Sequence, residues 1–142
     1  MAGYSGTPLA RKLGIKPGAR VALVRAPDGF EHCLEPLPDG VRVRTQARAS
    51  LDVVVFFATR LSELDRRFDG LARAVAPAGG LWIAWPKRTS YVATDLREGV
   101  VREVGLSHGL VDNMVCAVDD VWSGLRFVYR VSDRPSRNGR HR

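Results

Sequence analysis

Apolar residues along the chain form short continuous runs that are separated by turn residues. The strongest run covers residues 51–58, and its core at 53–57 is apolar on both faces. Such a run predicts a central parallel strand that is covered by helices on both sides. Runs at 20–24 and 81–85 predict two more buried strands, and the alternation at 41–44 predicts a half-buried one.

Between and after these strands, other segments show helical spacing. A helix capped by Thr59 or Ser62 is predicted from apolar residues on one face, namely Leu61, Leu64, Phe68, Leu71, Ala72 and Val75. A second helix is predicted to follow a cap at Thr94 and to end at Gly105. Short helical segments are predicted after Thr7 as far as Gly14, and at 30–34.

The end of the chain carries two more apolar runs, at 111–118 and 125–131. The connection between them, 119–124, is too short for a crossover helix, which predicts an antiparallel hairpin. The whole order predicts an α/β fold, a three-layer Rossmann-like sandwich with a six-stranded, mostly parallel sheet ending in that hairpin. We expect one domain over residues 1–131 and a disordered basic tail over 132–142, which has no apolar periodicity.

The formal net charge is +7, and the tail with four arginines and one aspartate supplies +3 of it. Because the remaining charge is spread along the chain, we expect nucleic-acid binding to be only weak and non-specific. No stretch approaches the roughly 18 apolar residues of a membrane helix, and the first residues lack a signal-peptide pattern. The sequence therefore predicts a cytoplasmic protein that does not contact the membrane.

Residues able to bind metal or to act as nucleophiles do not gather along the sequence. His32, His108 and His141 are far apart, and none has a ligand-like spacing with cysteine or acid, so no metal site is predicted. No serine lies in a nucleophile-elbow context. We therefore predict no catalytic residue.

Two stretches of the chain resemble class I S-adenosylmethionine-dependent methyltransferases. Residues 13–21 look like the lead-in to the first strand of that fold, and residues 51–57 with 77–83 look like its fourth and fifth strands. The resemblance implies a strand order of 2-1-3-4-6-5 in this chain's own numbering, with the last strand antiparallel.

Taken from Gly3 to about Tyr129, the chain closely resembles a family of uncharacterised bacterial proteins that carry a domain of unknown function. The recurring pieces of that family stand here at residues 3–9, 85–87, 93–96 and 121–127. This resemblance implies no particular activity.

The chain departs from the methyltransferase pattern where that fold holds its cofactor. After the first strand, 24–29 keeps a single glycine, Pro27 removes an amide donor, and Arg25 reverses the expected charge. After the next strand, Arg44 stands where an acid would hold the ribose hydroxyls. We therefore predict no cofactor and do not expect S-adenosylmethionine to bind.

Cations and hydroxyls follow the strands at the carboxyl edge of the predicted sheet, where open α/β sheets bind ligands. The candidate ligand-binding residues are Arg25, Asp28, Gly29, Lys87, Arg88, Thr89 and Ser90. The leading hypothesis is a non-catalytic or cryptic binding domain of methyltransferase-like ancestry for an anionic small molecule or a protein partner. The alternatives are an atypical S-adenosylmethionine-dependent methyltransferase and an accessory nucleic-acid-binding protein.

Overall fold

The computed structural model describes residues 7–48 and 50–133. The sequence piece at 3–6 and residues 134–142 of the tail predicted at 132–142 lie outside the described residues, so the disorder expected of 134–142 stays a prediction. The elements follow in the order α1 (Leu9–Lys12), β1 (Arg20–Val24), η1 (Phe30–Leu34), β2 (Arg42–Arg44), β3 (Leu51–Phe57), α2 (Leu61–Arg73), β4 (Val75–Pro86), η2 (Arg88–Ser90), α3 (Glu98–Ser107), β5 (Leu110–Ala117), β6 (Trp122–Tyr129) and η3 (Val131–Asp133).

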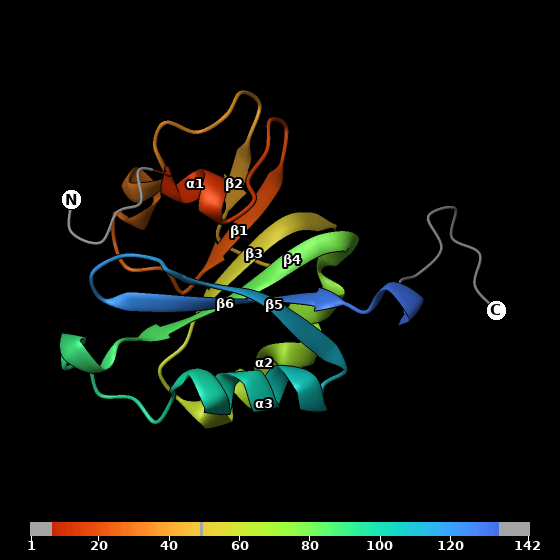
Figure 1. The fold of residues 1–142 in the computed structure, drawn as a ribbon. Coiled ribbons are helices and arrows are strands. Elements are labelled where there is room, and N and C mark those ends of the chain that lie inside the picture. The colour runs from red at the N-terminus through yellow and green to blue at the C-terminus, as the bar shows by residue number, and fades with distance from the viewer. Residues whose placement is uncertain (1–6, 49, 134–142) are drawn as a thin grey trace.

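The six strands form one sheet in the order β2-β1-β3-β4-β6-β5 (Figure 1). Strands β1 to β4 pair in parallel, while β6 is antiparallel to both β4 and β5. The predicted fold class and strand order are therefore confirmed.

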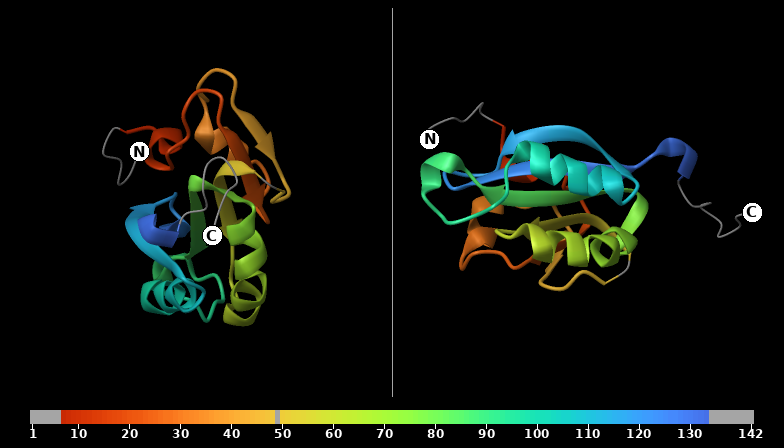
Figure 2. Two further views of the ribbon diagram at one scale, coloured as in Figure 1. Left: turned by 90° about the vertical axis from the view of Figure 1, so that its right-hand side faces the viewer. Right: turned by 90° about the horizontal axis from the view of Figure 1, so that it is seen from below.

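Helices cover both faces of this sheet (Figure 2). The long helices α2 and α3 lie side by side beneath it, and their apolar residues join one core cluster. The short segments α1 and η1 lie on the opposite face with a second cluster. Trp85 belongs to the first cluster and Trp82 to the second, as their odd spacing along one strand requires. The buried indole of Trp82 donates a hydrogen bond of 3.0 Å to the carbonyl oxygen of Leu13 and so ties α1 to the sheet.

Several predicted helix ends are wrong, because contacts from distant residues replace local caps. Helix α2 begins after Arg60, and neither Thr59 nor Ser62 caps it with a side-chain hydrogen bond. Helix α3 begins after Arg97 rather than Thr94, and it continues to Ser107 beyond the expected stop at Gly105. Gly105 is buried inside α3, where an added Cβ would overlap the ring of Phe127. Its small size therefore serves packing rather than chain termination.

Strand β4 is longer than predicted because its first residues pair with β3: Val75 lies opposite Leu51, and the register shifts before Gly80 pairs with Val53. Strand β6 begins at Trp122, which the sequence placed in a turn. None of the helices within 7–48 and 50–133 combines the length and the apolar character that a bilayer crossing requires.

Candidate functional site

Three strands end at the same edge of the sheet, because β1, β3 and β4 run parallel to one another. The segments that follow them are 25–29, 58–60 and 87–97. This carboxyl edge is where open α/β sheets place ligands.

The backbone at this edge has positive φ angles at two residues that carry side chains, a conformation that such residues rarely adopt. Arg25 has φ 60° at the end of β1, and Tyr91 has φ 61° after η2; they are the two non-glycine residues with positive φ in the described part of the chain. Each such residue costs on the order of 1–3 kcal/mol and persists only where its surroundings hold it. Gly29, with φ 76°, closes the same β1 loop.

The charge of Arg25 is compensated within the fold. Its Nη1 lies 2.7 Å from Oε2 of Glu63, in the first turn of α2. The carboxylate side chain is 15% exposed and the guanidinium 56%. The reversed charge that the sequence places after β1 is therefore matched by an acid 38 residues away.

The segment after β4 folds back onto the start of α2. The hydroxyl of Thr94 donates a 2.7 Å hydrogen bond to the carbonyl oxygen of Thr59, and Oδ1 of Asp95 accepts a 2.8 Å bond from the amide of Leu61. A carboxylate at this position also suits the positive end of the α2 dipole. The two loops therefore form one connected wall of the edge.

A tight turn begins the same segment. The amide of Lys87 donates to the carbonyl oxygen of Val121 over 2.7 Å. The hydroxyl of Ser90 donates to the carbonyl oxygen of Lys87 over 2.7 Å and accepts from the amide of Val92. These bonds fix a turn from which the side chain of Tyr91 projects, 94% exposed.

The residues predicted for an anion site thus come from two loops that share one edge. Asp28 and Gly29 are exposed in the β1 loop, and Arg88 and Thr89 are exposed on η2. Helix α3 begins after Arg97, and the hydroxyl of Thr94, which was expected to cap it, donates to the carbonyl oxygen of Thr59. The described residues contain no group of three His, Cys, Asp or Glu side chains placed to hold a metal ion.

An aromatic row lies at the same edge, and sequence reasoning missed it. Phe30, Phe57 and Trp122 pack edge to face, with ring centroids 4.8 Å and 5.1 Å apart. Phe57 ends β3, Phe30 opens η1, and Trp122 pairs with Pro86 at the end of β4. The first two rings are buried and Trp122 is half-buried, so the row presents a partly open aromatic surface.

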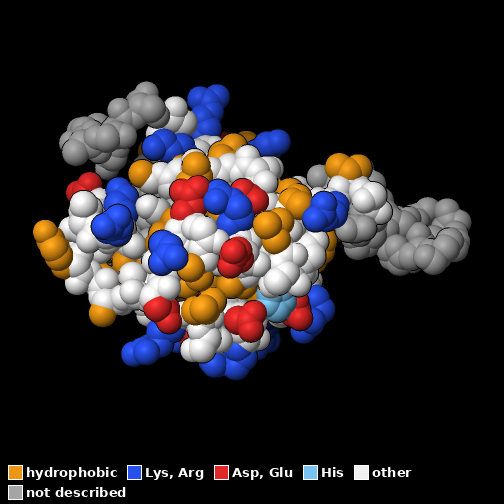
Figure 3. Space-filling model, turned by 60° about the horizontal axis from the view of Figure 1, so that its bottom comes forward, with side chains coloured by type: hydrophobic (Ala, Val, Ile, Leu, Met, Phe, Trp, Pro, Cys, Tyr) orange, Lys and Arg blue, Asp and Glu red, His pale blue; other side chains and the backbone are white. Residues whose placement is uncertain are grey.

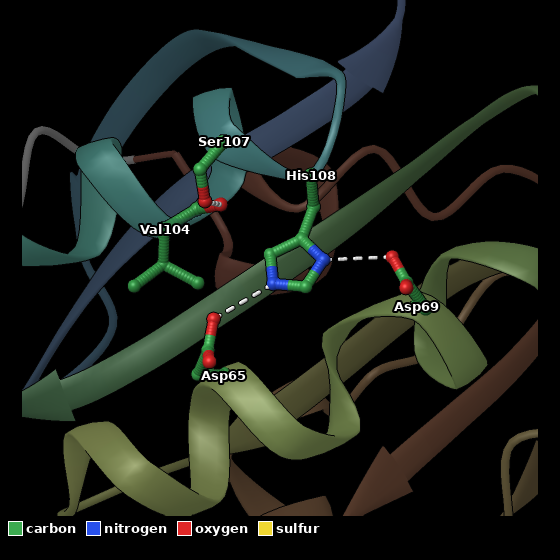
Figure 4. Close-up of polar contacts among 5 residues, drawn as sticks. All are labelled: Asp65, Asp69, Val104, Ser107 and His108. Atoms are coloured by element: carbon green, nitrogen blue, oxygen red, sulfur yellow. Dashed lines mark hydrogen bonds and ion pairs between the residues drawn. The ribbon is translucent and has the colours of Figure 1, made fainter.

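A second polar cluster joins α2 to the end of α3 (Figure 4). The ring of His108 places Nε2 2.8 Å from Asp65 and Nδ1 2.7 Å from Asp69, and it stacks on Phe68 with ring centroids 5.0 Å apart. Two carboxylate partners require both ring nitrogens to donate, which is possible only for the imidazolium. Burial lowers the pKa of His108, but hydrogen bonds to both aspartates outweigh it and raise the pKa overall.

No spacing in the sequence indicates this cluster, since Asp65 and Asp69 precede His108 by 43 and 39 residues. The acids at 65 and 69 do share one face of α2, but a helical pattern alone does not show what contacts that face. The cluster holds the two helices together and lies apart from the carboxyl edge.

Known structures share this fold, whereas no family model and no curated protein matches the chain. A SAM-dependent methyltransferase from Aquifex aeolicus superposes with a TM-score of 0.65 at 15% identity, over 84% of this chain and 86% of that one. The DhpI–SAH complex gives a TM-score of 0.60 at 14% identity, over 87% and 83%. Magnesium protoporphyrin IX methyltransferase (ChlM) from Synechocystis PCC 6803 with bound SAM gives 0.56 at 12% identity, over 86% and 74%.

These likenesses correct two expectations from the sequence. The main hypothesis of a non-catalytic or cryptic binding domain is contradicted, because solved structures that share the fold include S-adenosylmethionine-dependent methyltransferases, and this likeness favours the alternative. The expectation that S-adenosylmethionine does not bind is contradicted by these likenesses, because two of the similar structures are complexes with SAH or SAM. Physically, Arg25 reverses the charge after β1 as the sequence indicates, but the fold compensates this charge with Glu63.

Proposed function

We propose that this protein binds S-adenosylmethionine at the carboxyl edge of its sheet and transfers the methyl group to an acceptor. The observation that carries the proposal is the strand order β2-β1-β3-β4-β6-β5 with antiparallel β6, together with loops that meet beyond β1 and β3. When bound, the cofactor supplies a methyl group activated by its positively charged sulfur.

The residues of the β1 loop suit such a cofactor. Asp28 is an exposed carboxylate in that loop, and a carboxylate can accept hydrogen bonds from ribose hydroxyls. Gly29 has no side chain to keep a ligand from the backbone. The pairing of Arg25 with Glu63 prevents an uncompensated cation from opposing the positive sulfur.

The turn after β4 suits the acceptor side of the reaction. Lys87 and Arg88 form no ion pair within the described part of the chain, and the exposed ring of Tyr91 lies beside them in sequence. Two cations and an aromatic ring favour an acceptor that carries an anionic group and a flat apolar part. The family resemblance and the cytoplasmic location stay predictions of the sequence.

Calorimetric titration with S-adenosylmethionine and S-adenosylhomocysteine tests the proposal. We expect dissociation constants on the order of 10 μM, equivalent to about −7 kcal/mol. Asp28→Ala should weaken both ligands about tenfold, equivalent to about 1.4 kcal/mol. Asp39→Ala, which removes an exposed acid from the loop before β2 at the opposite edge of the sheet, should leave both affinities unchanged. Absence of binding at ligand concentrations of about 1 mM would overturn the proposal.

A further inference from the structure

The outer side of α2 borders a hollow of about 490 Å³ away from the carboxyl edge. The hollow is lined by Ala47, Arg66, Arg67, Asp69, Gly70, Leu71 and Arg73. Three of these seven residues are arginines of the same helix, α2. On the face seen in Figure 3, basic side chains lie along the lower rim, with acidic side chains beside them.

The arginines of the hollow are free to bind an anion. Within the described residues, Arg66, Arg67 and Arg73 form no ion pair. The one acid in the lining, Asp69, accepts a hydrogen bond from His108. Arg67 is half-buried, and its guanidinium carbon lies 5.0 Å from the centroid of the Phe56 ring. The fold therefore holds at least one of these guanidinium groups in place before any ligand arrives.

Edge strand β2 adds two more arginines on the same side of the sheet. Val43 packs into the cluster on the α1 side, so Arg42 and Arg44 alternate to the side of α2. Arg44 pairs in register with Ala22, which belongs to the α2-side core. Both arginines are exposed and have no ion pair among the described residues.

We propose that this arginine surface, defined as Arg42, Arg44, Arg66, Arg67 and Arg73, binds the phosphate backbone of a nucleic-acid strand. Guanidinium groups form paired hydrogen bonds with phosphate oxygens, which distinguishes arginine from lysine as a phosphate ligand. The site is distinct from the proposed cofactor edge and does not depend on methyl transfer. It also differs from the basic tail, to which the sequence attributed nucleic-acid binding.

The extent of the surface favours a polymer over a small anion. Along α2, Arg66 and Arg73 are seven residues apart, which corresponds to about 10 Å of helix. The arginines of β2 add a second element at the sheet edge. A single phosphate can contact a few of these groups, whereas a strand with a phosphate at every nucleotide can contact them in succession. Because backbone contacts carry no sequence information, binding should be non-specific.

Fluorescence anisotropy with a labelled single-stranded RNA and with DNA of the same sequence tests the inference on the full chain. Both should bind, with dissociation constants of about 10⁻⁶ to 10⁻⁴ M at physiological salt. The double variant Arg66→Ala/Arg73→Ala should bind at least fivefold more weakly. The slope of log affinity against log salt should become less negative by about 0.7 for each lost phosphate contact.

A matched control is the double variant Arg11→Ala/Arg130→Ala, which removes the same charge from two exposed positions, one on α1 and one just after β6. The affinity of this control for the labelled strand should fall by less than twofold. The variant Arg66→Lys/Arg73→Lys should bind more tightly than the corresponding alanine variant. Thermal melts check that all variants fold. Equal losses in both alanine variants would show that net charge or the tail binds the strand, and would overturn the inference. Displacement of RNA by low-millimolar pyrophosphate, or equally tight binding of polyglutamate, would overturn it in favour of a small anion or an acidic protein.

Discussion

Nη1 of Arg25 lies 2.7 Å from Oε2 of Glu63, and this ion pair joins the end of β1 to the first turn of α2. Arg25 holds a left-handed backbone conformation at this point. The pair therefore fixes both the shape and the charge of the loop that is proposed to face the cofactor. A partly exposed ion pair adds only about 0.5–1 kcal/mol to stability, so its main effect should appear in ligand binding.

Glu63→Gln should weaken S-adenosylmethionine more than S-adenosylhomocysteine. The variant leaves Arg25 uncompensated, and only the former ligand carries a positive sulfur. We expect a twofold to fivefold selective loss, in keeping with about 0.5–1 kcal/mol for a partly exposed charge pair. Calorimetry on both ligands measures it, with Glu103→Gln on α3 as the control. Equal losses for the two ligands would refute the electrostatic role of Glu63.

Gly105→Ala should destabilise the fold, because the added methyl group would overlap the ring of Phe127. Overpacking of this kind costs about 1–3 kcal/mol. Gly99→Ala is the matched control on the same helix, since nothing lies within 4 Å of the added Cβ, and it should stabilise α3 by about 0.5–1 kcal/mol. Urea unfolding measures both. A Gly105→Ala protein as stable as the parent would show that Phe127 moves aside freely.

Asp95→Ala should destabilise the fold, because it removes an N-cap acceptor that α2 receives from another segment. The substitution leaves the amide of Leu61 without its 2.8 Å acceptor. Loss of an N-cap acceptor costs about 0.5–2 kcal/mol. Asp95→Asn keeps an oxygen acceptor and should retain most of the stability. If thermal melts show no difference between the two variants, the cap is not stabilising.

The contribution of His108 to stability should depend on pH. Its folded-state pKa is raised above the ordinary value, so its stabilising effect is complete below about pH 6.5 and is lost as pH rises through the folded-state pKa. His108→Gln should therefore cost most near pH 6 and progressively less toward pH 9, by about 1–2 kcal/mol in all. Chemical unfolding at several pH values measures this difference.

Gln46→Ala provides the reference for that series, because Gln46 is an exposed, uncharged residue in the loop after β2. The free energy of unfolding of this reference variant should equal that of the parent protein at each pH. If the penalty of His108→Gln stayed constant from pH 6 to pH 9, the contacts with Asp65 and Asp69 would not depend on a charged imidazole.

The sequence by itself determined the sheet. Continuous apolar runs such as residues 51–57 require burial on both faces, and the short link between β5 and β6 permits only an antiparallel pair. With right-handed crossovers, few strand orders remain. These are local properties of composition and chain length, so the fold class could be predicted from them, whereas the strand order was implied by the resemblance to methyltransferases.

The tertiary structure decided the ends of the helices and the chemistry of the sites. Asp95 caps α2 from 34 residues away, Glu63 compensates Arg25 from 38 residues away, and His108 meets two aspartates of α2. The hollow of arginines likewise exists only where α2 meets the loop before β3. Hydrogen bonds and ion pairs form between groups that the packing of apolar faces brings together. Their partners therefore follow from the fold and cannot be found from spacing along the chain.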